Sequence, residues 1–252
     1  MRRYHQTEWQ DIQFSDFSRL SSTNLAGPTF YQAFYEEFFR RYQRWGQLSS
    51  DWLKQKERCA ELVLARSGDG ARILSVGCGL GTMEHYLHVR NPQLDLFIHE
   101  VAPSAWRWID GEFAAERKFL GLIPGCLPDG IRFDLVYLSA VDYALDDGAL
   151  VGLLAALRQF LAAPGGQCLL ISASFQITPV SAAARVVSLL RRLKALAAAA
   201  LDAFGLRPRG QFWGWLRTQE EYRSLLRRAG YGNIEDGFIE HEDQAQYWIA
   251  GR

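Results

Sequence analysis

A short apolar run followed by a glycine-rich turn constrains the fold of this chain more than any other feature. Residues 73–76 are typical of a buried parallel strand. Gly77, Gly79 and Gly81 follow at alternate positions, and a predicted helix begins directly after them. A strand, a glycine turn and a helix N-terminus together place backbone N–H groups beside a polar or anionic ligand. The G-x-G-x-G spacing differs from the dinucleotide fingerprint G-x-G-x-x-G, because Thr82 follows the third glycine.

The segments that follow the turn strengthen this interpretation. Residues 94–100 form a second apolar stretch that ends in an acid, Glu100. An acid at the end of the second strand can accept hydrogen bonds from both hydroxyls of a ribose. Residues 133–138 predict another strand, and Pro164, Gly165 and Gly166 separate a predicted helix from one more apolar run. These features favour a ligand with one nucleoside and no pyrophosphate.

From about Ala71 to the C-terminus, these motifs in this order resemble the class I S-adenosylmethionine-dependent methyltransferases. The resemblance implies an α/β fold with a doubly wound, mostly parallel seven-stranded sheet, which is Rossmann-like and closes with an antiparallel C-terminal hairpin. It implies S-adenosylmethionine as the cofactor. The residues that it implies for cofactor binding are Ser75, Gly77, Cys78, Gly79, Gly81, Glu100, Val101, Leu122 and Ser139.

The chain departs from the family pattern at two of these positions. The family usually has an acid where Ser75 stands, and that acid helps to bind the methionine amino group. Ser75 can still take part in a hydrogen bond, but it carries no charge. The family also often has an Asp just after the third strand, whereas residues 121–128 contain no acid. We therefore expect Leu122 and a backbone carbonyl to contact the adenine.

Two residues after the fourth predicted strand are the candidates for catalysis. In the resembled fold, residues 139–143 face the cofactor and the acceptor. Asp142 could take a proton from an acceptor hydroxyl or orient that hydroxyl, and Tyr143 could line the pocket. Asp142 could equally cap the loop or the next helix. His85 and His88 lie three residues apart without an evident third ligand, so no metal site is expected.

The order of predicted elements divides the chain into an N-terminal part and a core. Residues 1–70 are expected to form an arm and cap helices, and residues 71–252 the cofactor-binding core. We expect strands near residues 72–76, 94–99, 118–123, 133–138 and 167–172. Helix signals include capping-box spacing at Thr29 and Gln32 and again at Thr218 and Glu221, with Gly230 ending the last helix.

Residues 177–216 are expected to be an inserted helical lid over the carboxyl ends of the strands. Within it, residues 180–204 combine apolar and basic side chains at helical spacing. Such a helix usually packs its apolar side on the domain. It could instead contact a membrane surface, a glycolipid or an anionic substrate, which we favour less.

Composition and charge limit the kinds of molecule that we expect this protein to bind. Lys and Arg together number 28, equal to Asp and Glu, so no overall positive field favours nucleic acid. The four scattered cysteines are typical of a reduced, cytoplasmic protein. We therefore expect a methyltransferase acting on an O or N atom of a small metabolite, such as a natural-product or sugar-containing intermediate. An NAD-type oxidoreductase and a noncatalytic scaffold with the same fold are the alternatives.

Overall fold

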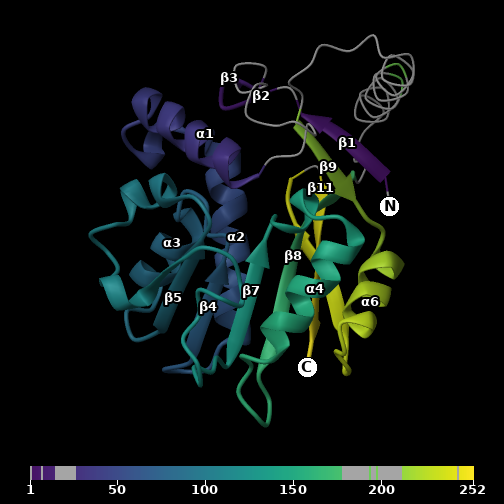
Figure 1. Cartoon of the computed structure of the whole chain (residues 1–252). Coiled ribbons are helices and arrows are strands. Elements are labelled where there is room, and N and C mark those ends of the chain that lie inside the picture. Colours follow the sequence, from purple (N-terminus) through teal and green to yellow (C-terminus); the bar gives the residue numbers. More distant parts are fainter. Residues whose placement is uncertain are drawn as a thin grey trace.

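The computed structural model describes residues 2–6, 8–14, 27–177, 193, 197, 212–242 and 244–252. Its centre is a seven-stranded sheet (Figure 1). In spatial order the strands are β10 (Glu235–Glu240), β11 (Gln244–Gly251), β8 (Gln167–Ile177), β7 (Leu135–Ser139), β4 (Arg72–Val76), β5 (Asp95–Glu100) and β6 (Lys118–Leu120). The five strands from β8 to β6 are parallel, and β11 runs antiparallel to both β8 and β10. The predicted fold class is confirmed.

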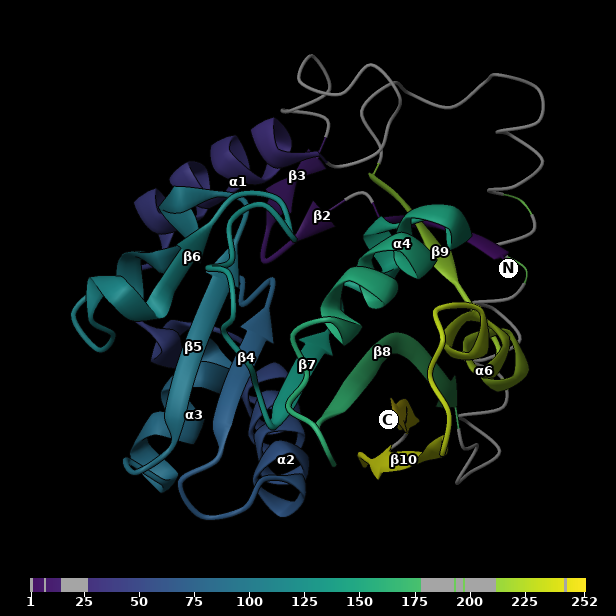
Figure 2. The same ribbon diagram turned by 60° about the horizontal axis from the view of Figure 1, so that its bottom comes forward.

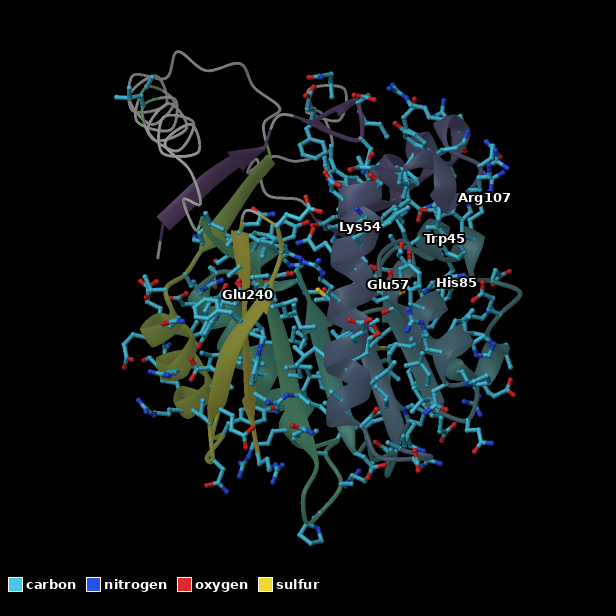
Figure 3. The ribbon with its side chains drawn as sticks, turned by 180° about the vertical axis from the view of Figure 1, so that it is seen from behind. Trp45, Lys54, Glu57, His85, Arg107 and Glu240 are labelled. Carbon is cyan, nitrogen blue, oxygen red and sulfur yellow. The ribbon has the colours of Figure 1, made fainter. Side chains whose placement is uncertain are left out.

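Side chains of the buried strands alternate between the two faces of the sheet, and a different pair of helices covers each face. Leu74 and Val136 pack with α4 (Asp147–Arg158) and α6 (Gln219–Arg228) in one apolar cluster. Their neighbours Ile73 and Leu135 belong to a second cluster with α2 (Ser50–Arg66) and α3 (Thr82–Arg90). Successive side chains of a strand point to opposite faces, so strands covered on both faces are apolar at nearly every position. Figure 3, seen from behind, shows α2 lying across the face opposite to α4.

Several predicted boundaries differ from the observed ones. The strand expected over residues 118–123 ends at Leu120, and β8 continues to Ile177 because it pairs with β11 along that length. The capping box at Thr218 and Glu221 is confirmed, as is Gly230 just after α6 with φ +89°. The capping box expected at Thr29 and Gln32 is wrong. Helix α1 (Pro28–Arg41) begins after Gly27 without a side-chain cap.

A third apolar cluster forms a cap over the carboxyl ends of the strands. It joins α1 to η3 (Pro103–Trp108) and to the short strands β2 (Glu8–Trp9) and β3 (Ile12–Gln13). Phe30, Phe34 and Phe38 recur every four residues on α1 and are buried there. Figure 2 shows β2 and β3 beyond the arrowhead of β4, next to α1. Other short helices in the described part of the chain are η2 (Trp45–Gln47), η4 (Ala115–Arg117) and η5 (Asp142–Ala144).

A separate two-stranded sheet connects the N-terminal arm to the chain that follows β8. Strand β1 (Arg2–Gln6) pairs antiparallel with β9 (Phe212–Leu216), and Figure 1 shows both at the carboxyl end of the main sheet. Apart from positions 193 and 197, residues 178–211 of the predicted lid, which include the basic segment 180–204, lie outside the described residues. No helix in the described parts of the chain is both long and apolar enough to cross a bilayer.

Candidate functional site

The glycine turn connects β4 to α3 in a conformation that side chains disfavour. Gly77, Gly79 and Gly81 have φ angles of +67°, +59° and +71°. A Cβ on Gly77 would lie 2.7 Å from Val141 Cγ2, and one on Gly81 would lie 2.4 Å from Ile109 Cδ1. Packing within the protein therefore requires glycine at these two positions. A Cβ on Gly79 would meet only the Tyr35 hydroxyl, at 3.2 Å, so protein atoms leave the space beside this glycine largely open to a ligand.

The turn is held by the last two residues of β5. The N–H groups of Gly77 and Cys78 donate to the carbonyl of His99, at 2.9 and 3.0 Å. The Glu100 carboxylate accepts from the N–H groups of Gly79, at 2.9 Å, and Val101, at 2.7 Å. Burial raises the pKa of Glu100, and these backbone donors oppose that shift. In this structure Glu100 thus fixes the shape of the turn.

The His99 ring bridges the glycine turn and the end of β6. Its Nε2 lies 2.7 Å from the carbonyl oxygen of Gly121, which can only accept, so Nε2 carries the proton. Nδ1 then accepts from the N–H of Gly77, at 3.3 Å. Burial lowers the pKa of His99, which favours this neutral form. The ring ties together the ends of three neighbouring strands.

A cavity of about 340 Å³ opens between the turn and the cap. Its floor consists of the glycine turn and the ends of β4 and β7, and its walls are largely aromatic. The aromatic lining residues are Trp9, Phe14, Phe30, Tyr31, Phe34, Tyr35, Trp52, Tyr143 and Phe175. This volume and lining are typical of sites for small organic ligands.

The structure brings six of the predicted site residues to this cavity: Ser75, Gly77, Cys78, Gly79, Ser139 and Tyr143. Gly81 is the N-cap residue of α3, where it shapes the turn. Glu100 and Val101 lie beside the turn but not among the lining residues. Leu122 is 72% exposed and does not line the cavity, because β6 ends before it.

Asp142 lies in a buried polar network behind the cavity. Its carboxylate accepts from the hydroxyls of Tyr222 and Ser172 and from the N–H of Ala173. The Arg217 guanidinium donates to the Asp142 carbonyl, at 2.7 Å, and also binds Asp147, at 2.8 Å. Asp142 is fully buried and does not line the cavity. Of the two roles considered for Asp142, these contacts favour support of the loop, because the carboxylate binds protein groups and does not face the cavity.

Sequence reasoning missed the charged groups of the cavity. Glu84 on α3 and Lys56 on α2 are its two formally charged side chains among the described residues. Ser75 Oγ and Tyr137 Oη both donate to Glu84 Oε1, each at 2.6 Å. The position of Glu84 in the first turn of α3, directly after the glycine turn, was the one available signal. Groups of three or more side chains suited to a metal are absent from the parts of the chain that the structure describes.

No protein-family model matches the chain, and no curated protein matches it in sequence. Solved structures do match its fold. Magnesium protoporphyrin IX methyltransferase (ChlM) from Synechocystis PCC 6803, solved with bound S-adenosylhomocysteine, is 13% identical with a TM-score of 0.57, and the match covers 89% of this chain and 97% of that one.

Two further matches are longer proteins. The mitomycin 7-O-methyltransferase MmcR is 19% identical with a TM-score of 0.54, covering 94% of this chain and 66% of its own. The pyocyanin biosynthetic protein PhzM is 20% identical with a TM-score of 0.56, covering 94% and 67%. This chain therefore spans about two thirds of the length of both. By its strand order, its glycine turn and these matches, the chain has the fold of the class I S-adenosylmethionine-dependent methyltransferases.

Proposed function

We propose that this protein is an S-adenosylmethionine-dependent methyltransferase that acts on an O or N atom of a small metabolite. The observation that carries the proposal is the cavity itself. It joins the glycine turn of this fold to a largely aromatic cap at the carboxyl ends of the strands, where open α/β sheets bind ligands. Two of the matched proteins, magnesium protoporphyrin IX methyltransferase and mitomycin 7-O-methyltransferase, are named for small-molecule acceptors.

The residues at the cavity floor fit the proposed cofactor. Protein atoms leave the space beside Gly79 largely open, whereas a Cβ on either of the other two glycines would clash with Val141 or Ile109. Glu84 Oε2 is buried and has no hydrogen-bond partner among the described residues, so it can accept a hydrogen bond from a bound ligand. Ser75, Gly77, Cys78, Gly79 and Ser139 would hold the cofactor at this floor, with Glu100 and Val101 beside the turn. When bound, the cofactor supplies a methyl group already activated on a sulfonium.

Because the donor is activated, the protein has mainly to align the acceptor and exclude water. At the cavity wall the Trp9 ring contacts the rings of Phe34 and Trp52, with centroids 5.6 Å apart in both pairs. Such a wall suits a flat, apolar acceptor better than a nucleic-acid backbone, which requires clustered basic residues.

Tyr143 is the side chain that we propose for positioning the acceptor. Its hydroxyl lies 3.0 Å from the Tyr31 hydroxyl at the cavity. Burial raises the pKa of Tyr143 to about 12. The phenol therefore stays protonated near neutral pH, where it can donate or accept a hydrogen bond but cannot act as a phenolate base.

We also infer that residues 1–70 cap the core formed by residues 71–252, and that residues 177–216 help to close the cavity. The pairing of β1 with β9 supports this inference, because it links the N-terminal arm to the described end of the proposed lid. A closed cavity would exclude water from the acceptor.

A methyl-transfer assay tests the proposed function. Protein and isotope-labelled S-adenosylmethionine are incubated with fractionated small metabolites, nucleic acid and protein. We expect label to enter a small-molecule fraction, with one S-adenosylhomocysteine formed for each methyl group transferred. Label mainly in nucleic acid or protein would contradict the proposed acceptor class. Cofactor binding without transfer to any fraction would favour a noncatalytic scaffold.

A further inference from the structure

The cavity holds one acid and one base that face it from different helices without pairing with each other. Glu84 is in the first turn of α3, and Lys56 is in the middle of α2. No ion pair within 4.0 Å joins them, although the positive charge of Lys56 is near enough to oppose the rise that burial causes in the pKa of Glu84. Each side chain is held by contacts of its own, Glu84 by Ser75 and Tyr137, and Lys56 by Ser139. This arrangement is complementary to a ligand that carries both charges.

Glu84 uses only one of its two carboxylate oxygens for hydrogen bonds within the described protein. It is 2% exposed, and both protein donors, Ser75 and Tyr137, bind its Oε1. Its Oε2 is left without a partner among the described residues. The side-chain oxygen of a neutral glutamine could accept from the same two hydroxyls. These two hydrogen bonds therefore require neither a negative charge on Glu84 nor its second oxygen. A buried carboxylate oxygen without a donor is costly, and an ammonium ion would satisfy it.

Lys56 is the corresponding cation. Its Nζ lies 3.4 Å from Ser139 Oγ and 5.5 Å from the centre of the Trp52 ring. Ser139 ends β7, the strand beside β4, so the ammonium group of Lys56 lies near the floor of the cavity rather than at its rim. Neither contact neutralises its charge. An anionic ligand group at this point would do so.

We propose that Glu84 and Lys56 bind the zwitterionic amino-acid end of the cofactor, Glu84 its ammonium group and Lys56 its carboxylate. The proposal rests on the proposed function and adds the two residues that recognise the methionine portion. It also explains how the chain manages without an acid at position 75. The carboxylate comes from α3 instead, and Ser75 has become one of the donors that orient it.

The test is isothermal titration with S-adenosylhomocysteine and two analogues, one without the α-amino group and one without the carboxylate. The wild-type protein should bind each analogue about ten- to a hundredfold more weakly than S-adenosylhomocysteine, as expected for a charge-assisted hydrogen bond. Glu84→Gln should lose the discrimination against the deaminated analogue only. Lys56→Met should lose the discrimination against the decarboxylated analogue only.

Two variants on α2 serve as matched controls. Glu57→Gln and Lys54→Met remove the same charges from residues that do not line the cavity (labelled in Figure 3), and both should behave as wild type. If Glu84→Gln does not fold, Glu84→Asp is measured instead. Its carboxylate is one methylene shorter, so it should also lose most of the discrimination against the deaminated analogue.

The outcomes separate the two proposals. Wild-type protein that fails to bind S-adenosylhomocysteine would overturn the proposed function and this assignment with it. Wild-type protein that binds S-adenosylhomocysteine but treats the analogues equally would overturn the assignment alone. Unchanged discrimination in either the Glu84 or the Lys56 variant would do the same.

Discussion

The Ser75 hydroxyl, near the end of β4, donates a 2.6 Å hydrogen bond to the Glu84 carboxylate in the first turn of α3. Both side chains are almost fully buried, at 1% and 2% exposure. The helix N-terminus favours a carboxylate at this place. The pair gives the cavity floor a carboxyl group that comes from the helix and not from the strand. Burial raises the pKa of Glu84, and the hydroxyls of Ser75 and Tyr137 oppose that shift.

Moving the carboxylate from position 84 to position 75 should be tolerated better than adding a second carboxylate at position 75. Ser75→Asp alone places a second carboxylate against Glu84, and like charges in a buried site repel. We expect it to lower the free energy of unfolding by about 1–3 kcal/mol. Adding Glu84→Gln should recover most of that loss, because one carboxylate then remains. Urea unfolding of both variants measures this, and a double variant less stable than Ser75→Asp would refute it.

Asp142 should matter for stability more than for chemistry. Asp142→Ala leaves the buried Tyr222 hydroxyl and the Ala173 N–H without their acceptor, and we expect a loss of about 3–5 kcal/mol in unfolding free energy. Tyr222→Phe should cost less, about 1–3 kcal/mol. Denaturant unfolding measures both. A stable Asp142→Ala protein that binds cofactor but transfers no methyl group would instead place Asp142 in catalysis.

His99 should make stability dependent on pH. Its pKa is lowered from an ordinary value of 6.5, chiefly by burial, so the unfolded chain binds a proton more readily than the folded one. The contribution of neutral His99 is therefore complete above about pH 6.5 and is lost as the pH falls through the lowered pKa. Unfolding free energies from about pH 7 to about pH 5 should converge between wild type and His99→Gln. Parallel pH curves for the two proteins would rule this out.

The sequence predicted what is determined locally. The apolar runs predicted the strands of the sheet. The capping box of Thr218 and Glu221 was predictable because these two residues lie within one helical turn of each other. The capping box expected at Thr29 and Gln32 did not form because α1 already begins at Pro28, one residue before Thr29, and because the Gln32 side chain is bound to Ser104, 72 residues away. Glu84 was missed for the same reason. A glutamate in a first helical turn usually faces solvent, and its burial depends on Tyr137, a partner 53 residues further along the chain.

Tyr143→Phe separates positioning of the acceptor from binding of the cofactor. It removes only the hydroxyl that lies beside Tyr31 at the cavity. We expect the rate of methyl transfer to fall about five- to tenfold, as for one lost hydrogen bond, with the affinity for S-adenosylhomocysteine unchanged. Single-turnover rates and titration measure the two effects. Equal losses of rate and affinity would mean that Tyr143 shapes the cofactor site.

Direct titration of the wild-type protein with S-adenosylmethionine and S-adenosylhomocysteine tests the central claim. We predict one site with low-micromolar affinity and no binding of NAD. Gly79→Val should weaken binding severely, because it fills the open backbone position of the turn, whereas Gly152→Val on the exposed side of α4 should not. Absence of binding at millimolar S-adenosylhomocysteine, or binding of NAD in its place, would contradict the account.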